Sequence, residues 1–375
     1  MKSSTRQYFQ FAHHHILLLT LVYFSGRVLD AHAVPKQRPF NNTIPAILVF
    51  GDSTVDPGNN DYINRVFKGN FPPYGRDFAN HAATGRFTNG RLPSDYIILY
   101  MGIKDYIPPY LNQSLSIEEL ITGVSFASAG TGYDPLTPTL SNVVSLQKQL
   151  EYFQEYRERL EGAIGKEETG DLIKRSIFLL SAGTNDFALN YFTEQLRRLS
   201  FSASNYEKFV LQHFKGFIQG LLSQGATKIA VVGLPPMGCL PVIITSNTIP
   251  LTGRQCVERI NSVARDYNTL LQSEMRHLQS TQLNKETKIY YADIYGPLQD
   301  MIQNHQRYGF EVVSRACCGT GLVEASFMCN AKTPVCPDAS KYIFWDAIHP
   351  TDRAYYLIFQ AFRPLIDFII KDSTS

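Results

Sequence analysis

The amino-acid sequence predicts an α/β fold, in which a parallel β-sheet lies between two layers of helices. Short apolar runs that end in turn residues alternate along the chain with longer segments of helical periodicity. Apolar runs of this kind are typical of strands that are buried on both faces, and right-handed crossovers then connect them. The predicted strands are residues 46–50, 124–127, 177–180, 229–232 and 289–292.

The segments between the strands have the spacing of amphipathic helices. Apolar side chains recur at helical steps in residues 141–160, and residues 205–225 behave likewise, with Gly225 placed as a C-terminal stop. Ligands of such sheets bind at the carboxyl ends of the strands, so the turns there are the candidate positions for a functional site. The apolar positions of the first helical segment are Val143, Leu146, Leu150, Phe153 and Leu160.

Residues 1–33 have the pattern of a secretory signal peptide. Two basic residues precede the apolar run "ILLLTLVYF", and a small-x-small site ends at Ala33. The apolar run is too short to cross a bilayer, and no later segment approaches the required length. We therefore expect a secreted protein, without stable membrane insertion, whose residues 34–375 form a single domain. The N-x-S/T triplets at Asn41 and Asn112 predict N-glycosylation.

The charge of the predicted mature chain is balanced. The leader carries three of the 35 basic residues and one of the 33 acidic residues, so equal numbers remain. A balanced chain gives no reason to expect nucleic acid or anionic lipid as a partner. The partner must therefore be inferred from a site, and we expect a small-molecule or polymer-linked substrate bound by a monomer.

All six cysteines lie in the C-terminal half of the chain, and structural disulfides are the favoured interpretation in a secreted protein. Two cysteines are adjacent and cannot easily bond each other, so each is expected to pair with one of the last two, and the first two then pair together. A zinc site is the alternative, but there is no CxxC pair and the nearby His305 has no ligand-like spacing. The six are Cys239, Cys256, Cys317, Cys318, Cys329 and Cys336.

One histidine has the neighbours that a catalytic base requires. His349 follows Asp346 by three residues, after an aromatic approach, and Pro350 stiffens the backbone behind it. A carboxylate bonded to Nδ1 holds an imidazole in one tautomer and stabilises the imidazolium that forms on proton transfer. We interpret His349 as a general base and Asp346 as its orienting acid. The other histidines of the predicted mature chain lie in helical patterns or polar turns: His81, His213, His277 and His305.

The candidate nucleophile is Ser53. The G-x-S-x-G elbow of α/β-hydrolases is absent, whereas "GDS" directly follows the first predicted strand. A serine at this junction can expose its hydroxyl at the carboxyl edge of the sheet. The alternative is that Asp52 or Ser53 only caps the next helix.

Two further strand ends offer donors for an oxyanion. "FASAGTG" contains Gly130, whose missing Cβ lets its N–H approach a substrate closely, and "GTND" contains Asn185, whose side-chain amide can donate. Preorganised donors of this kind stabilise a tetrahedral intermediate. A glycine turn and an asparagine helix cap are the ordinary interpretations of each motif alone.

Taken together, these motifs resemble the GDSL type of the SGNH hydrolase superfamily, and in particular the large secreted plant GDSL esterase/lipases. The resemblance covers nearly all of the predicted mature chain. One departure is "SFASAG", where the family often has "NFASGG", so that Ser125 and Ala129 replace Asn and Gly. The motifs are "FGDSTVDPGNND", "GRFTNGRLPSDY", "FASAGTGYD", "SAGTNDF", "GLPPMGCLP", "CCGTG" and "FWDAIHPT".

The resemblance implies a three-layer α/β/α sandwich with a five-stranded parallel sheet, of the flavodoxin-like SGNH hydrolase type. It implies Ser53 as nucleophile, His349 as base and Asp346 as the orienting acid. It also implies an oxyanion hole made by the Ser53 N–H, Gly130 and Asn185, with neither a metal nor an organic cofactor.

The function expected from these residues is that of a secreted carboxylester hydrolase, an esterase or lipase that acts through an acyl-serine intermediate. An acyltransferase that uses an alcohol in place of water is the alternative, and a non-catalytic binding protein is the third possibility. We expect an extracellular location, in the cell wall or apoplast. Short esters, acylated polysaccharides, cutin-type polyesters and lipids all remain open as substrates, and loops such as "NFPPYG" and "DPLTPTL" are expected to shape the pocket.

Overall fold

A four-stranded parallel sheet forms the centre of the fold, in the order β1-β2-β3-β4. The strands pair in register, so that Ile47 of β1 lies beside Ile177 of β2, and Lys228 of β3 lies beside Lys288 of β4. The structure is a computed structural model, and it describes residues 44–247, 253–281 and 286–373. These residues belong to the compact unit Pro39–Ser375. The predicted leader and Asn41 lie outside the described residues.

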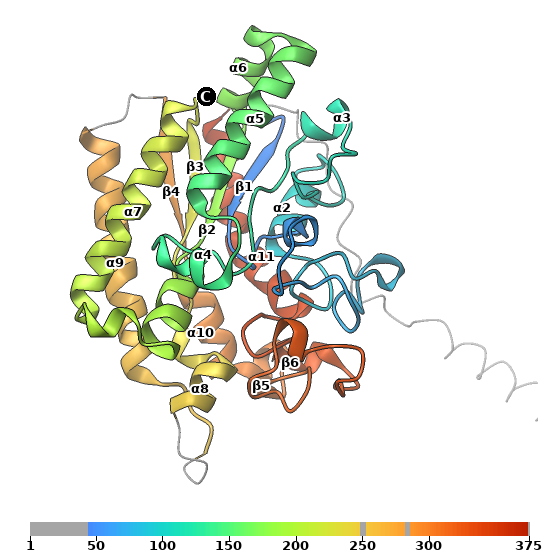
Figure 1. Cartoon of the computed structure of the whole chain (residues 1–375), viewed down its shortest axis with the longest axis vertical. Coiled ribbons are helices and arrows are strands. Elements are labelled where there is room, and N and C mark those ends of the chain that lie inside the picture. Colours follow the sequence, from blue (N-terminus) through green and yellow to red (C-terminus); the bar gives the residue numbers. More distant parts are fainter. Residues whose placement is uncertain (1–43, 248–252, 282–285, 374–375) are drawn as a thin grey trace, which may run out of the picture. The chain divides into compact units, whose positions relative to one another are not determined.

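Helices separate the strands along the chain, as the alternating pattern predicts (Figure 1). The strands of the main sheet are β1 (Ile47–Gly51), β2 (Ile177–Ser181), β3 (Lys228–Val232) and β4 (Lys288–Ala292). The helices are α2 (Pro93–Tyr100), α3 (Ile117–Leu120), α4 (Leu136–Ser141), α5 (Leu146–Ile164), α6 (Lys166–Arg175), α7 (Ala203–Ser223), α8 (Pro241–Asn247), α9 (Glu258–Thr281), α10 (Tyr295–Gln303) and α11 (Asp352–Asp372).

Alternate residues of the strands pack against the two helix layers. On one face, the ring of Phe50 stacks on Phe178 and meets Phe153 of α5 and Phe217 of α7 edge-on. Helices α5 and α9 each pack against α7, and Figure 1 shows α5 across the strands with α7 and α9 to its left. The sheet is therefore apolar on both faces, because every residue of β1 and β2 is buried.

The opposite face of the sheet packs against α2 and α11. Ile97 of α2 and Phe362 and Ile366 of α11 lie around the same small space as Ile47 and Leu179 of the strands. These two helices also pack on each other. The predicted α/β/α sandwich is confirmed by these two layers.

The expected fifth strand, residues 124–127, does not extend the main sheet as a regular strand. It bonds along β1, where Val49 donates to the Val124 carbonyl at 3.0 Å and Phe126 donates to the Val49 carbonyl at 2.7 Å. Only a single parallel bridge, between Val49 and Ser125, forms on that side. The next rung of this ladder is missing because the Gly51 N–H, which would donate to the Phe126 carbonyl, donates to Gln149 Oε1 at 2.9 Å instead.

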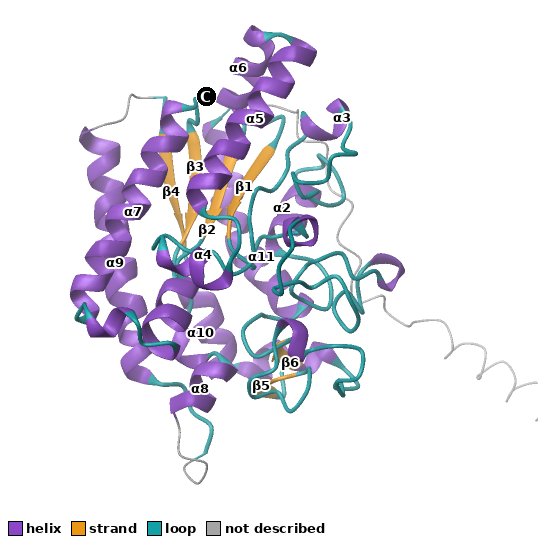
Figure 2. Cartoon of the chain, viewed as in Figure 1, coloured by secondary structure: helices purple, strands orange, loops and turns teal. Residues whose placement is uncertain are grey.

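The segment that contains the last four cysteines forms a small second sheet, which the sequence pattern does not predict. Strands β5 (Val312–Ala316) and β6 (Tyr342–Phe344) pair in parallel, and the residues between them are mostly loop (Figure 2). Two disulfides close this segment and a third lies before α9. They join Cys317 to Cys336, Cys318 to Cys329, and Cys239 to Cys256.

Among the residues that the structure describes, no helix is both long enough and apolar enough to cross a membrane. These residues also contain no group of three or more His, Cys, Asp or Glu side chains arranged to hold a metal ion.

Candidate active site

The end of β1 is held so that the next residues turn out of the sheet. Gly51 has φ of +134°, and a Cβ there would lie 1.8 Å from the carbonyl oxygen of Ser181 in β2, so only glycine fits. The buried side chain of Gln149 in α5 brackets this glycine, accepting from its N–H and donating to its carbonyl, each at 2.9 Å. The Asp52 N–H then donates to the Ser181 carbonyl at 2.9 Å. These bonds therefore fix the backbone that precedes Ser53.

Asp52 closes this turn, and neither it nor Ser53 caps a helix. Its Oδ1 accepts from the N–H and the hydroxyl of Thr54, at 3.0 and 2.8 Å. Burial raises the pKa of Asp52 to about 6, against the opposing effect of these two hydrogen bonds. The next helical turn begins only at Asn59 and has no side-chain cap.

Ser53, His349 and Asp346 form one hydrogen-bonded chain. Ser53 Oγ lies 2.8 Å from His349 Nε2, and His349 Nδ1 lies 2.8 Å from each carboxylate oxygen of Asp346. Asp346 is fully buried, whereas Ser53 is 6% exposed and His349 is 4% exposed. Ser53 and His349 are thus slightly exposed and Asp346 is not, so a substrate must reach the site at the serine and imidazole.

The Asp346 carboxylate is fixed by its own turn and by one distant side chain. Its Oδ1 accepts from the backbone N–H groups of Ile348 and His349, at 2.9 and 2.8 Å. Its Oδ2 accepts from the phenol of Tyr74 at 2.7 Å, and that phenol accepts from the Ser326 N–H at 2.7 Å. Burial and the neighbouring Asp346 raise the pKa of Tyr74 well above 10, so the phenol stays protonated and donates.

The imidazole is positioned by the elements on either side of it. Thr351 caps α11 with its hydroxyl, and its N–H donates to the Ile343 carbonyl of β6 at 2.8 Å. The ring of Phe87 lies against the imidazole, with 5.1 Å between ring centroids. This arrangement fixes the Asp346 to Pro350 turn between β6 and α11.

The "GRFTNGR" motif supports the same turn from a second segment. The Thr88 hydroxyl donates to the Pro350 carbonyl at 3.0 Å, and Asn89 Oδ1 accepts from the Asp352 N–H at 2.9 Å. Gly90 lies so close that a Cβ there would meet Asp352 Oδ1 at 2.5 Å. The motif therefore acts on the site through backbone and side-chain contacts to residues 350–352.

Gly130 lies in a loop that is tied to the turn of Ser53. Its φ is +91°, and two residues earlier the Ser128 N–H donates to the Gly51 carbonyl at 2.9 Å. Asp56 accepts from the Ala129 N–H at 2.9 Å. Among the described residues, the N–H groups of Ser53 and Gly130 have no acceptor, which leaves both available to a ligand.

Asn185 lies in the turn that follows β2, at the start of η3 (Asp186–Thr193), and is 4% exposed. Its side-chain amide donates to the Thr131 carbonyl at 2.8 Å, which places it beside the Gly130 loop. A primary amide carries two N–H donors, so one remains for another acceptor. The two segments that carry Gly130 and Asn185 are thus joined to each other and to the end of β1.

The remaining histidines are separate from this arrangement. His213 of α7 is half-buried, and His277 of α9 is exposed. His81 and His305 each bond a nearby backbone carbonyl, that of Arg76 and that of Phe310.

Sequence reasoning missed Tyr74, which belongs to "NFPPYG" and was expected only to shape a pocket. It also missed the polar residues that follow Ser53. The Asn60 amide donates to the Ala129 carbonyl at 3.0 Å and its Oδ1 accepts from the Ser128 hydroxyl at 2.5 Å. A signal was present in "STVDPGNND", where several polar residues follow a strand end although no helix requires them.

The fold and this arrangement define an α/β protein with a Ser-His-Asp chain at the carboxyl edge of its sheet. Residues 47–362 match the family model described as GDSL-like Lipase/Acylhydrolase. The chain therefore belongs to the GDSL lipase/acylhydrolase family, as the motifs predicted.

Relatives support the same membership over nearly the full length. A GDSL esterase/lipase of Arabidopsis thaliana is 51% identical over 347 residues, which are 92% of each chain. A second from the same plant is 42% identical over 342 residues, covering 91% of this chain and 94% of its own. A solved structure of a gut microbial diltiazem-metabolizing enzyme overlaps 87% of this chain and 47% of its own at 12% identity, but its TM-score of 0.37 is too low to carry an argument. The protein is thus a carboxylic ester hydrolase of the esterase/lipase kind.

Proposed function

We propose that this protein is a secreted serine esterase that cleaves carboxylic esters through an acyl-Ser53 intermediate. The observation that carries the proposal is the 2.8 Å contact between Ser53 Oγ and His349 Nε2, continued on Nδ1 by the buried Asp346. In this geometry the imidazole can accept the serine proton while the carboxylate stabilises the resulting imidazolium. The disulfides and the N-terminal pattern support the secreted location.

In the first half-reaction, His349 takes the proton from Ser53 Oγ as that oxygen attacks the ester carbonyl carbon. The carbonyl electron pair moves to oxygen, and the free N–H groups of Ser53 and Gly130 and the second N–H of Asn185 are the proposed donors to it. When the carbonyl re-forms, the bond to the alcohol oxygen breaks, and His349 gives its proton to that leaving group.

In the second half-reaction, water replaces the alcohol. His349 takes a proton from water as the water oxygen attacks the acyl carbon, and the bond to Ser53 Oγ then breaks. The serine recovers its proton from the imidazolium and the carboxylic acid leaves. An alcohol acceptor in place of water would give the acyltransferase alternative, and product analysis with added alcohol separates the two.

Hydrolysis of p-nitrophenyl esters of increasing chain length by the secreted protein tests the proposal. We expect Ser53→Ala and His349→Ala each to lower kcat by about 10⁴-fold or more. Thermal unfolding of each variant serves as the control for folding. Retained activity in a folded Ser53→Ala protein would rule out the acyl-serine mechanism.

The mature chain is part of the same proposal. We expect N-terminal sequencing of the secreted protein to show a chain that begins at Val34, with residues 34–375 as one domain.

Asn112 is expected to carry a glycan. Its Oδ1 accepts from the N–H and hydroxyl of Ser114, at 3.1 and 2.8 Å, while its side-chain nitrogen has no acceptor among the described residues. Release of the glycan should lower the mass of the peptide that contains Asn112, and an unmodified peptide would contradict this expectation.

A further inference from the structure

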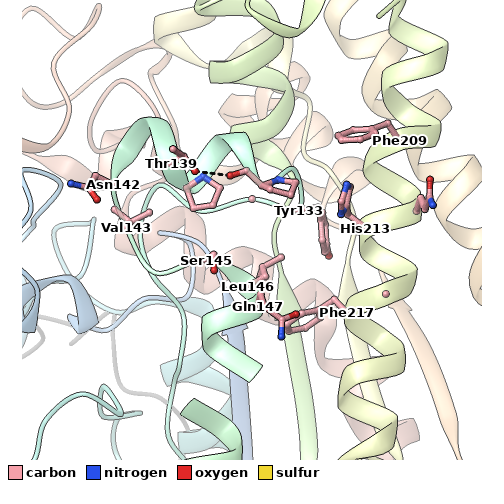
Figure 3. A pocket seen from close by; sticks show the side chains of 15 residues that line it. Tyr133, Thr139, Asn142, Val143, Ser145, Leu146, Gln147, Phe209, His213 and Phe217 are labelled. Carbon is pink, nitrogen blue, oxygen red and sulfur yellow. Dashed lines mark hydrogen bonds between the residues drawn. The ribbon is translucent and has the colours of Figure 1, made fainter. Parts of the chain in front are cut away.

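A groove lies between α4, the first turn of α5 and α7 (Figure 3). Its volume is about 950 Å³. This lies at the upper end of the range of about 300–1,000 Å³ for sites that take small molecules. The groove therefore has room for a ligand much larger than a short acyl group.

One wall of the groove is formed by the loop that contains Gly130. Gly132 and Tyr133 come just after Gly130 in the sequence, and both line the groove. A Cβ at Gly130 would lie 3.6 Å from Val143 Cγ2, and Val143 lines the groove as well. A ligand bound there would thus lie close to an ester whose carbonyl oxygen is bound at Gly130.

Buried hydrogen bonds hold this wall in place. The Asp186 carboxylate accepts from the N–H groups of Tyr133 and Asp134, at 2.8 and 3.2 Å. The Asp134 carboxylate forms two bonds with Arg197, at 2.7 and 2.6 Å. Asp134 is therefore paired with Arg197 and Asp186 is satisfied by hydrogen bonds, so the wall is formed without a ligand.

The fifteen lining residues include none of the four charged types Lys, Arg, Asp and Glu. The one titratable imidazole, that of His213, has its pKa lowered by burial and so is neutral at pH 7. A phosphate headgroup or an acidic sugar would find no counter-charge there. The groove thus favours an uncharged ligand.

Aromatic rings and amides share the lining. Tyr133, Phe209 and Phe217 contribute rings, and Figure 3 shows them together with His213. The side chains of Asn142, Gln147 and Gln212 also line the groove; all three residues are exposed, and their amides have no protein partner among the described residues. An alkyl chain would leave these amides to water, whereas a sugar offers them hydroxyl groups and presents the flat apolar face of its ring to the aromatics.

We propose that this groove binds the neutral saccharide portion of an acylated carbohydrate, with the acyl ester presented to Ser53. The proposal rests on the proposed esterase function and specifies its substrate class. The groove supplies recognition of the sugar, and the Ser-His-Asp chain supplies the chemistry.

Binding of unacylated saccharide by the full secreted protein tests the groove without any turnover. Titration calorimetry would use neutral β-1,4-linked hexasaccharides of xylose and of glucose, with hexagalacturonate as the charged probe and 1-octanol as the uncharged alkyl probe. We expect a neutral hexasaccharide to bind more tightly than either of the other two probes. Tighter binding of 1-octanol, or no saccharide binding, would overturn the proposal.

Gly216 of α7 offers a variant that fills the groove without disturbing the core. It lines the groove, and a Cβ at this position has no atom within 4 Å. Leucine also has a higher helix propensity than glycine, so Gly216→Leu should fold. We expect it to weaken saccharide binding by about tenfold or more, and Gln212→Ala to weaken it by a smaller factor.

Gly162→Leu in α5 is the matched control, because it too has open space at Cβ but does not line the groove. It should leave saccharide binding unchanged, and equal losses in both leucine variants would overturn the proposal. Hydrolysis of p-nitrophenyl acetate by the wild-type protein separates a failure of the proposed saccharide groove from a failure of the proposed esterase function. An active esterase without saccharide binding contradicts the groove alone, and a saccharide-binding protein without any esterase activity contradicts the proposed function.

Discussion

The phenol of Tyr74 donates a hydrogen bond to Asp346 Oδ2 at 2.7 Å, across 272 residues of sequence. The ring is 1% exposed and packs edge-on against Trp345, with 6.4 Å between ring centroids. The Ser-His-Asp chain therefore has a fourth member that reaches the acid from the loop after β1. A hydrogen bond to a buried carboxylate stabilises its charge and holds it in position.

Tyr74→Phe should lower kcat with little change in KM. Loss of a hydrogen bond to a charged group costs about 1.5–3 kcal/mol, which corresponds to about ten- to a hundredfold in rate if it acts on the transition state. Steady-state kinetics measures kcat and KM separately.

Tyr267→Phe is the matched control for that variant. Tyr267 is also 1% exposed, and its hydroxyl has no hydrogen-bond partner among the described residues. It should leave kcat unchanged. A kcat equal to that of the wild type in Tyr74→Phe would show that Tyr74 serves packing alone.

The disulfide between Cys318 and Cys329 should affect both stability and activity. It closes the loop that carries Ser326, whose N–H donates to Tyr74 at 2.7 Å. Replacing both cysteines with serine should lower the free energy of unfolding by about 3 kcal/mol. It should also reduce kcat, by less than the loss in Tyr74→Phe, as measured by denaturation and kinetics on the same protein.

The disulfide between Cys239 and Cys256 provides the comparison. Its removal should lower the stability by a similar amount of about 3 kcal/mol. No contact of this pair reaches Tyr74 or the Ser-His-Asp chain in the described residues, so kcat should be retained. Equal losses of kcat in the two double variants would indicate a general effect of destabilisation.

The buried ion pair between Arg86 and Asp95 should dominate the stability of the "GRFTNGRLPSDY" segment. Its two bonds are 2.8 Å each, and Asp95 also accepts from the N–H groups of Leu92 and Ile107. Asp95→Asn should cost about 3–5 kcal/mol, because it leaves the guanidinium buried without its counter-charge. Chemical denaturation measures the loss.

The exposed pair between Arg175 and Asp171 gives the contrast for that experiment. Both side chains are about half exposed, at 46% and 58%. Asp171→Asn should change the free energy of unfolding by less than about 0.5 kcal/mol. Similar losses in the two variants would contradict the importance assigned to burial.

Asp186 should make the stability depend on pH. Burial raises its pKa to about 7, while the Thr137 hydroxyl and the Tyr133 N–H oppose that shift. A carboxyl whose pKa is higher in the folded state than in the unfolded state stabilises the fold most at low pH, and this contribution is lost as the pH rises from about 4 to 7. Asp186→Asn should therefore flatten the decrease in unfolding free energy over this range. Identical slopes in the variant and the wild type would contradict the shift.

The sequence predicted those features that depend on local patterns. The strand at residues 177–180 and the stop at Gly225 follow from apolar runs and turn residues, and β2 and α7 end within two residues of them. The contact between Asp346 and His349 follows from a spacing of three on one turn. The catalytic roles of Ser53, Gly130 and Asn185 stay predictions, although the hydrogen bonds support the assignment.

The features that sequence could not predict depend on contacts between distant segments. Gln149 takes the Gly51 N–H that would have continued the pairing of a fifth strand, and no local pattern shows this. The adjacent cysteines left two pairings open, and only the path of the chain selects Cys317 with Cys336. Tyr74 stands in a proline-rich loop without periodicity, so its bond to Asp346 has no signature in the sequence.

Peptide mass spectrometry after labelling with a fluorophosphonate tests the acyl-serine mechanism most directly. We expect a single adduct on Ser53 in the wild-type protein, because the imidazole 2.8 Å away activates this hydroxyl. His349→Ala should lose the label while remaining folded. An adduct on a different residue, or ester hydrolysis that persists in an unlabelled Ser53→Ala protein, would contradict this mechanism.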